Sequence, residues 1–207
     1  MNIIDKSCVY GNNCQFGSFV IIEEDVVIGN NVKIGNRVTL KPGTIIGDNS
    51  IIDDHCITTG ACIIGNNVNV RTGAIVSKAT VIEDYSFIGP GVITNHTKHV
   101  THGRKQKISE EQLVTYIGYG AIIGSQASIL AGVIMEPEVI VGGGSVVVKN
   151  LASGVYVGSP AKRISAIPQA YKLDLPENAG SQYLSKQSFQ HLKKYMPFLI
   201  NNCLFEL

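Results

Sequence analysis

The sequence has almost no excess charge of either sign, because its 17 lysine and arginine residues nearly balance its 16 aspartate and glutamate residues. A formal net charge of +1 gives no reason to expect nucleic acid or a membrane surface as a partner. The chain also lacks an apolar run of transmembrane length, and its N-terminus lacks the basic-then-apolar order of a signal peptide. These absences favour a cytoplasmic protein.

The cysteines do not form a disulfide framework. Cys8 and Cys14, and then Cys56 and Cys62, are spaced by six residues, which at first suggests one. All four occupy one small slot of the repeat described next, and neighbours six apart in that repeat lie on different faces. We therefore predict free thiols that serve packing.

What the sequence has in quantity is a repeat of six residues, which keeps one register from Ile4 to Ile93. Four residues after each large position stands a small or β-branched residue, as in Cys8 and Val20. With Thr58 as the one exception, the large slot is apolar throughout, and it holds Ile4, Tyr10, Phe16, Ile22, Ile28, Ile34, Leu40, Ile46, Ile52, Thr58, Ile64, Val70, Val76, Ile82 and Ile88.

This period predicts an all-β solenoid, a prism of short strands joined by tight turns. Glycine, asparagine and aspartate supply the turns, as in Ile28-Gly29-Asn30-Asn31. Three hexads make a coil of triangular cross-section, so residues one coil apart should stack in neighbouring strands about 4.8 Å apart. A helix is excluded because a period of six does not match 3.6.

The repeat is interrupted once, and residues 94–116 are predicted to form a 23-residue excursion from the prism. Loops of that length inside a compact domain are usually functional or disordered. The repeat then resumes with Ile117, Ile123, Ile129, Met135, Val141 and Val147.

The pattern fades after Leu151, so we divide the chain into a solenoid domain at residues 1–165 and a C-terminal tail at residues 166–207. The tail is predicted to contain a short amphipathic helix that packs on the prism or on a partner subunit. Its apolar residues are Tyr183, Leu184, Phe189, Leu192, Tyr195 and Met196.

Three later segments resemble the hexapeptide-repeat acyltransferases, whose fold is a left-handed parallel β-helix. The segments read IGYGAIIGSQASILAGVI, VGGGSVVVKN and VGSPAKRI, and the last contains the Gly-x-Pro-Ala-Lys turn that closes the prism in that family. The left-handed winding is implied by the resemblance alone. The resemblance also implies a homotrimer, with acetyl-CoA as co-substrate bound between subunits and no metal.

The excursion carries His96, His99 and His102, and imidazole suits the transfer of a proton near neutral pH. In the family's O-acetyltransferases a histidine lies where the long loop leaves the last regular hexad. Thr94-Asn95-His96 matches that place, so the resemblance implies His96 and Asn95 as catalytic residues. The nucleotide-sugar N-acetyltransferases often have Thr-Asn here without the histidine. All three histidines could instead be polar residues of an exposed loop.

The resemblance also places the acetyl-CoA groove. Ser125 and Gly143 match positions that contact the pantetheine arm in galactoside-type relatives. Lys149 matches a lysine near the nucleotide end, and Lys162 and Arg163 match basic residues that reach the CoA phosphates. Ordinary turn formation would also explain many of the glycines.

Charged residues of the excursion allow two interpretations, a solvated loop or an anion-binding lid. They are Lys98, Arg104, Lys105, Lys107, Glu110 and Glu111.

Two other classes of protein are alternatives to an acyltransferase. Gamma-class carbonic anhydrases share the prism, but they draw zinc ligands from separate coils, which three histidines of one loop do not reproduce. A non-enzymatic scaffold is the other alternative, and both the histidine-bearing loop and the basic residues at the CoA end argue against it.

Among acyltransferases, a prism that begins at once and a loop after many regular hexads resemble the amino-sugar N-acetyltransferases of surface-polysaccharide pathways. The expected acceptor is therefore a small molecule, a nucleotide-linked amino deoxysugar. The alternative is O-acetylation of a sugar or xenobiotic hydroxyl, which the presence of His96 favours.

Overall fold

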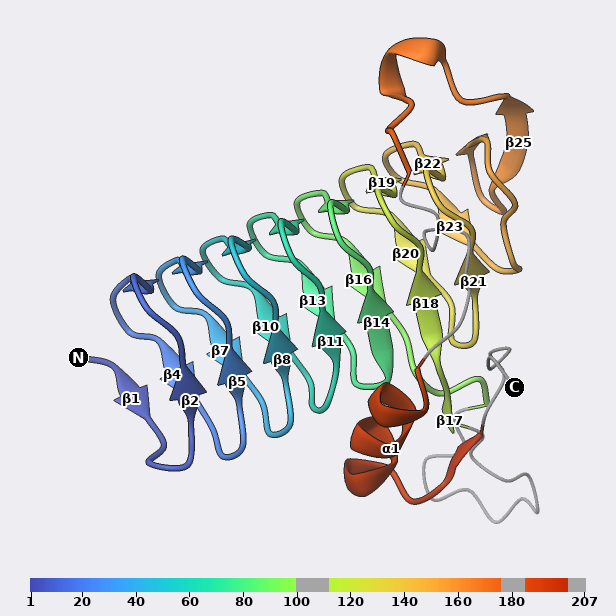
Figure 1. Ribbon diagram of the computed structural model, residues 1–207. Coiled ribbons are helices and arrows are strands. Elements are labelled where there is room, and N and C mark those ends of the chain that lie inside the picture. The colour runs from blue at the N-terminus through green and yellow to red at the C-terminus, as the bar shows by residue number, and fades with distance from the viewer. Residues whose placement is uncertain (100–111, 176–184, 201–207) are drawn as a thin grey trace.

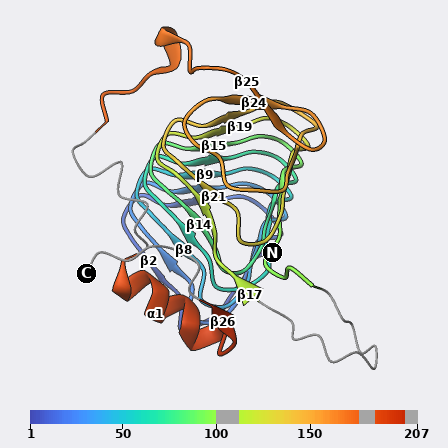
Figure 2. The same ribbon diagram turned by 90° about the vertical axis from the view of Figure 1, so that its right-hand side faces the viewer.

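The computed structural model describes residues 1–99, 112–175 and 185–200, and it shows a parallel β-helix with one short helix against its side (Figure 1). Each coil contributes a short strand to each of three faces. Seen end-on, the coils nest in a three-sided outline (Figure 2). The predicted solenoid is confirmed.

The first face is an eight-stranded parallel sheet of β1 (Ile3–Ile4), β4 (Ile21–Ile22), β7 (Thr39–Leu40), β10 (Ile57–Thr58), β13 (Ile75–Val76), β16 (Ile93–Thr94), β20 (Ser128–Ile129) and β23 (Val146–Val147). The second face is a seven-stranded parallel sheet of β2 (Val9–Tyr10), β5 (Val27–Ile28), β8 (Ile45–Ile46), β11 (Ile63–Ile64), β14 (Thr80–Ile82), β18 (Thr115–Ile117) and β21 (Ile134–Met135).

The third face contains β3 (Gln15–Phe16), β6 (Lys33–Ile34), β9 (Ile51–Ile52), β12 (Asn69–Val70), β15 (Phe87–Ile88), β19 (Ile122–Ile123), β22 (Ile140–Val141), β24 (Val155–Val157) and β25 (Lys162–Ser165). All of its strands are parallel except β25, which turns back antiparallel to β24. This hairpin closes the C-terminal end of the prism.

Successive coils keep the register that the sequence predicts, with three hexads to a coil. Ile46 of β8 pairs with Ile28 on one side and with Ile64 on the other, and Ile64 pairs in turn with Ile82. In Figure 2 the C-terminal end faces the viewer, and the chain passes clockwise from the second face to the third as it advances toward the viewer. That winding is left-handed.

From Ile22 onward the large slot points into the prism and forms one continuous apolar core, whereas Ile4 and Tyr10 of the first coil are 37 % and 52 % exposed. Ile22, Ile46, Ile82 and Ile129, for example, are at most 1 % exposed. Thr58, the exception in the large slot, also points inward, and its hydroxyl lies 2.8 Å from the hydroxyl of Thr44. A pair of hydroxyls that satisfy one another can be buried without the cost of an orphaned polar group.

Many of the turns rely on one residue with positive φ. Asn31, Asn49 and Asn67 take this left-handed conformation at φ values of 57°, 59° and 56°, and Gly43 does so at 73°. Asparagine and glycine adopt it at the lowest cost. The four described cysteines are free and lie in or beside the core, as predicted, and burial raises the pKa of Cys62 to about 12.

The excursion enlarges one coil without changing the register of the prism. Ile82 pairs with Ile117 across it, so the ladder of the second face continues as if nothing had been inserted. The excursion leaves the corner between the first and second faces after β16 and returns through β17 (Gln112–Leu113) to β18. The predicted range of 94–116 therefore includes the end of β16 and the start of β18, and residues 100–111 lie outside the described part of the chain.

The tail contains η1 (Gln169–Tyr171), α1 (Lys186–Tyr195) and β26 (Leu199–Ile200). α1 packs on the second face, where Phe189 and Leu192 join Val81 and Tyr116 in a second apolar cluster. Ser185 caps the helix, because its hydroxyl accepts a hydrogen bond of 3.0 Å from the Ser188 N–H. The tail thus packs on its own prism.

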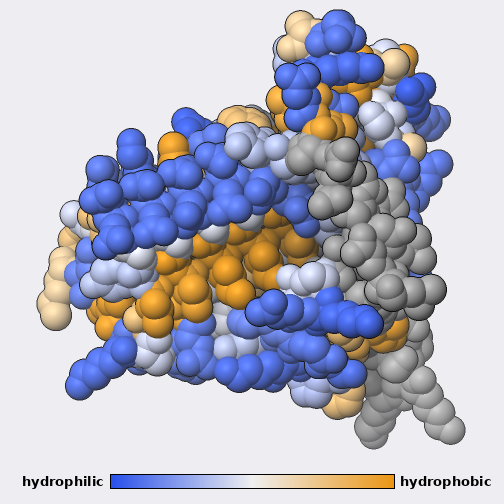
Figure 3. Space-filling view, viewed as in Figure 1, coloured by the Kyte–Doolittle hydropathy of each residue, from blue (hydrophilic) through white to orange (hydrophobic). Residues whose placement is uncertain are grey.

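Figure 3 shows an apolar stripe running along the second face between two hydrophilic bands. Outward-pointing Val9 and Val27 are 62 % and 41 % exposed in the first coils, whereas Val81 and Tyr116 are buried near α1. The helix therefore leaves the outward-facing residues of the first coils exposed, although its C-terminal end reaches the turns at Asp25 and Gly43.

Candidate active site

A hollow of about 250 Å³ lies at the corner between the first and second faces, where the excursion leaves the prism. Its floor is apolar, because Leu130 and Val148 project outward from equivalent places on successive coils. Its full lining is Asn95, Thr97, Lys98, Leu130, Ala131 and Val148. A small apolar cavity with a few polar groups at one edge is the usual form of a ligand site.

Asn95 is fixed at the edge of this hollow by three hydrogen bonds. Its backbone N–H and its side-chain Nδ2 both donate to the carbonyl oxygen of Ile129, at 2.9 Å and 3.0 Å. Its own carbonyl oxygen accepts a hydrogen bond of 2.8 Å from the hydroxyl of Thr115. Asn95 therefore has a single orientation, which is what a residue that positions a substrate requires.

Buried hydroxyls support the same corner from inside the prism. Thr94 occupies an inward slot of β16, and its hydroxyl lies 2.8 Å from the hydroxyl of Thr80. Ser77 donates its hydroxyl to the Thr94 carbonyl oxygen at 2.6 Å and its backbone N–H to the Thr94 hydroxyl at 2.8 Å. Within the described residues, no buried side-chain nitrogen or oxygen atom lacks a partner.

His96 follows Asn95 and is half-buried. Its backbone carbonyl oxygen accepts a hydrogen bond of 3.1 Å from the Leu113 N–H, and Thr97 forms an antiparallel bridge with Gln112. The two ends of the excursion are thus joined directly beside the hollow. Of the described residues of the excursion, Asn95, Thr97 and Lys98 line the hollow, and His96 is not among the lining.

The other predicted residues of the excursion follow His96 in the chain. His99 is exposed. Lys98 is exposed as well and lines the hollow, where its charge favours an anionic ligand. Outside the described residues lie His102, Arg104, Lys105, Lys107, Glu110 and Glu111.

Ser125 and Gly143 lie close together, but on another corner of the prism. They are exposed neighbours on successive turns between the third and first faces. A Cβ atom on Gly143 would lie 3.2 Å from the carbonyl oxygen of Ser125, so a larger side chain would crowd this turn. The first face separates this corner from Asn95.

Lys149, Lys162 and Arg163 lie at the C-terminal end of the prism and are exposed. Lys149 directly follows Val148, which lines the hollow. Lys162 and Arg163 lie on β25, opposite Val157 and Tyr156 of β24. The three cations therefore occupy one end of the molecule, two of them on a short hairpin and one at the corner that holds the hollow.

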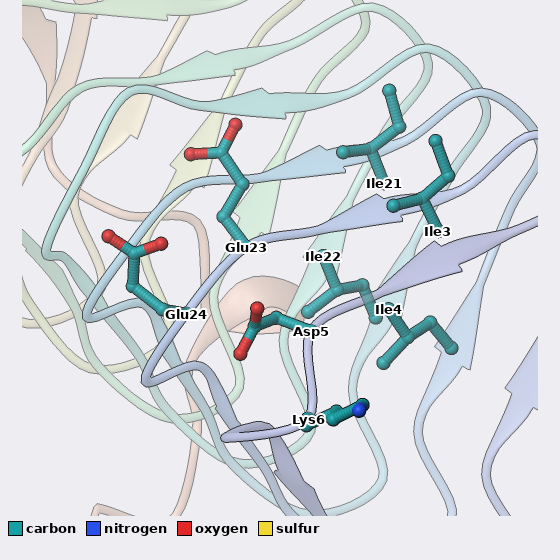
Figure 4. A pocket seen from close by; sticks show the side chains of 8 residues that line it. All are labelled: Ile3, Ile4, Asp5, Lys6, Ile21, Ile22, Glu23 and Glu24. Atoms are coloured by element: carbon teal, nitrogen blue, oxygen red, sulfur yellow. The ribbon is translucent and has the colours of Figure 1, made fainter.

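A larger hollow, of about 380 Å³, lies at the opposite end of the same corner (Figure 4). The carboxylates of Asp5, Glu23 and Glu24 stand on its turns and outnumber the one lysine of its lining, Lys6, while Glu23 is paired with Lys41 at 2.5 Å. Clustered carboxylates repel a phosphorylated ligand. The smaller hollow beside Asn95 and Lys98 is therefore the candidate active site.

Two general properties of the described residues bear on the site. No group of three or more histidine, cysteine, aspartate or glutamate side chains in residues 1–99, 112–175 and 185–200 is arranged to hold a metal ion. Across the same residues, none of the helices has the length and apolar character needed to cross a membrane.

Sequence reasoning missed several residues of the site. Thr115 occupies the small slot before Ile117, in register with Thr80, but its role depends on a contact with Asn95 across the whole excursion. Leu130 and Ala131 have an ordinary turn sequence, and only the neighbouring coil makes them the wall of a hollow. A sequence signal was available for Leu130 and Val148, which are exposed apolar residues one coil apart.

Comparison with known proteins adds a family and a set of related folds. The family model described as the GMPPB C-terminal domain matches residues 2–114. No curated protein matches the chain. Among solved structures, the polySia-specific acetyltransferase NeuO is similar at 18 % identity and a TM-score of 0.61, with 95 % of this chain and 98 % of that one covered.

Two structures of AntD, an N-acyltransferase from Bacillus cereus, are also similar. A mutant in complex with dTDP and coenzyme A has 20 % identity and a TM-score of 0.58, covering 78 % of this chain and 85 % of that one. Another, in complex with dTDP-4-amino-4,6-dideoxyglucose and coenzyme A, has 22 % identity and a TM-score of 0.53, covering 78 % and 84 %. At these identities the likeness shows a shared fold.

Proposed function

This chain belongs to the GMPPB C-terminal domain family, and we propose that it is an acetyl-CoA-dependent acetyltransferase that acetylates the amino group of a nucleotide-linked amino deoxysugar. The observation that carries the proposal is that the two ends of the excursion are joined to each other where they meet the prism. There Asn95 is held by Ile129 and Thr115, and His96 by Leu113, beside a hollow of about 250 Å³. The AntD complex that holds dTDP-4-amino-4,6-dideoxyglucose and coenzyme A on a similar fold supports the same substrate class.

In the proposed reaction the acceptor nitrogen attacks the thioester carbonyl carbon. An N–C bond forms, the C–S bond breaks, and the thiol of coenzyme A leaves. His96 accepts the proton that the nitrogen loses and passes it to the departing sulfur, a task that suits an imidazole near neutral pH. Asn95 orients the acceptor, because its two hydrogen bonds to the Ile129 carbonyl oxygen fix the orientation of its own side chain.

The co-substrate would lie along the first face. Ser125 and Gly143 would allow the pantetheine arm to approach the backbone closely, because neither residue has a large side chain. Lys149, Lys162 and Arg163 would pair with its phosphates at the C-terminal end of the prism. Lys98, at the hollow, would pair with a phosphate of the nucleotide acceptor.

The separation between Asn95 and the turns that carry Ser125 and Gly143 fits a homotrimer with sites between subunits. Ser125 and Gly143 lie across the first face from Asn95 in the same chain. A neighbouring copy that packs its own prism against this corner would bring its Ser125 and Gly143 turn near Asn95 and complete the groove. This arrangement is part of the proposal.

A second candidate function is O-acetylation of a sugar or xenobiotic hydroxyl. His96 favours it, because a hydroxyl needs a base as it attacks, whereas a neutral amine is already nucleophilic. A non-enzymatic scaffold is the third candidate.

The test is a thiol-release assay with acetyl-CoA and a panel of acceptors. The panel contains nucleotide-linked amino sugars, the same nucleotide sugars without the amine, and simple glycosides. We expect release only with the amine-bearing compounds, and a product that resists mild alkali because it is an amide. An alkali-labile product from a hydroxyl acceptor would establish the O-acetyl alternative. Release no faster than in the absence of acceptor, across the whole panel, would favour the scaffold.

A further inference from the structure

The last described strand of the chain pairs with the base of the excursion. β26 runs parallel to β17, with Leu199 opposite Gln112 and Ile200 opposite Leu113. Figure 2 shows the two strands side by side at the edge of the prism where α1 ends. A contact between the tail and the excursion, which are far apart in the sequence, is not required by the hexapeptide repeat, because neither segment follows it.

β17 is the central member of this small assembly. On its other side it holds the outgoing chain of the excursion, through the bridge from Gln112 to Thr97 and the hydrogen bond from the Leu113 N–H to the His96 carbonyl oxygen. The order across the assembly is therefore β26, then β17, then the segment that carries His96. A two-stranded pairing alone is marginally stable in water, and a third strand adds stability.

The tail is itself anchored to the prism, so β26 has a fixed position. Leu192 and Met196 at the end of α1 are at most 1 % exposed in the cluster on the second face, and Leu199 is 5 % exposed in the same cluster. The Leu199 N–H also donates to the Met196 carbonyl oxygen at 2.9 Å, which ties the strand to the end of the helix. Movement of β26 would therefore require the loss of buried apolar contacts.

β17 also contacts the wall of the hollow. The side chain of Leu113 fills the space beside Gly132, where an added Cβ atom would lie 2.6 Å from the Leu113 Cδ1 atom. Gly132 follows Ala131, which lines the hollow. A shift of β17 would thus displace both the His96 segment and one wall of the site.

We propose that β26 is a positioning element of the active site, which holds His96 in place by completing the sheet around β17. The role of His96 in this inference rests on the proposed function. The stabilisation of the His96 segment by β26 does not depend on that function. In this view β26 is required for turnover although Leu199 and Ile200 do not line the hollow. Its contribution is to keep the reacting groups in register, and small misplacements of such groups are costly in rate.

The test uses Ile200→Pro in the full chain, with Ile200→Val as the matched control. Ile200 is 44 % exposed, so both substitutions leave the apolar cluster intact, whereas proline cannot donate to the strand ladder. Hydrogen exchange should become at least about tenfold faster at the Leu113 amide in the proline variant, with no change in β5 to β13. The valine variant should exchange like the parent protein.

Turnover gives the second readout. The proline variant should lose about 10- to 100-fold in kcat, with the KM for acetyl-CoA within about threefold of the parent value. Deletion of residues 199–207, compared with deletion of residues 201–207, should reproduce the same contrast.

Unchanged exchange at the Leu113 amide in both the proline variant and the longer deletion would overturn the inference, as would faster exchange with an unchanged kcat. If the exchange result is as expected and no variant, the parent included, transfers acetyl, then the proposed function fails and the mechanical coupling stands.

Discussion

The hydroxyl of Thr115 donates a hydrogen bond of 2.8 Å to the carbonyl oxygen of Asn95. The hydroxyl oxygen of Thr115 also accepts a hydrogen bond of 3.3 Å from the Gly132 N–H. One buried side chain therefore joins the residue at which the excursion leaves, the strand on which it returns, and the next coil. The geometry of the proposed site depends on this connection as much as on the residues that would meet a substrate.

Replacement of Thr115 by valine should weaken both the fold and the site. Valine has the same shape but leaves the Asn95 carbonyl and the Gly132 N–H without this partner, at a cost of about 1–3 kcal/mol in the free energy of unfolding. Chemical denaturation measures that loss. Thr115→Ser keeps the hydroxyl and is the control, and an equal loss in both variants would show that the methyl group matters instead.

The variant His96→Asn should separate the two acceptor classes. With a hydroxyl acceptor, the loss of the base should lower kcat about 10²- to 10⁴-fold, and the loss with an amine should be smaller. His99→Asn and His102→Asn should stay within about threefold of the parent, as expected for groups that transfer no proton. A large effect at His99 or His102 together with none at His96 would show that the base is misassigned.

Removal of both basic side chains of β25, as Lys162→Ala with Arg163→Ala, should raise the KM for acetyl-CoA far more than the KM for the acceptor. Each charged contact with a phosphate is worth about 1–3 kcal/mol, which is about 5- to 150-fold in binding. Steady-state kinetics with each substrate varied in turn will measure the two constants. An unaltered KM for acetyl-CoA would place its phosphates elsewhere.

The substitution Ile46→Asp should prevent stable folding of the prism. Ile46 is 1 % exposed between Ile28 and Ile64, so the new carboxylate would be buried without a partner, at a cost of several kcal/mol. Ile46→Val in the same position should cost only about 0.5–1.5 kcal/mol. Thermal denaturation of the two variants side by side is the measurement, and similar melting temperatures would contradict the inward assignment.

Glu83 should make the stability of the protein depend on pH. Burial raises the pKa of its carboxyl group, while a hydrogen bond of 2.8 Å from the Tyr116 hydroxyl acts in the opposite direction and the nearby Asp84 raises the pKa further. The folded state then binds the proton more tightly than the unfolded chain does. Its contribution to stability is complete below the unfolded pKa and is lost as the pH rises through the folded value.

Glu83→Gln removes this dependence while it keeps an oxygen that can accept from Tyr116. The gain in stability of the variant over the parent should therefore be larger at about pH 7.5 than at about pH 4. Urea denaturation at the two values will show it, and a gain that is equal at both would mean that the carboxyl is not perturbed in the folded protein.

The prism was predictable from sequence because its determinants are local and repeated. Each inward isoleucine, such as Ile46, needs only the equivalent residue of the adjacent coil to define its neighbour. Thr58 also points inward, because its hydroxyl pairs with the hydroxyl of Thr44, although no pattern in the sequence predicts that pair. The end of the regular repeat was harder to locate, because Thr94 looks polar and yet occupies an inward slot beside Thr80.

The site could be predicted only in part. Asn95 and His96 stand at the base of the excursion, as the sequence indicates, because the loss of the repeat marks that place. The residues that hold them could not be found the same way. Thr115 and Leu113 act through contacts that close only when the excursion returns, and Leu199 acts from the tail. Contacts of that kind have no periodic signature.

The unbroken pairing of Ile82 with Ile117 across the excursion has a consequence for how such a protein can diversify. The entropy needed to close a loop grows only with the logarithm of its length, so doubling an insertion costs about 0.6 kcal/mol. A corner of the prism can therefore exchange one insertion for another of different length and chemistry while every coil above and below stays in phase. The prism can be kept through evolution while the insertion at this corner changes. The choice of acceptor can therefore change without any change in how the prism folds.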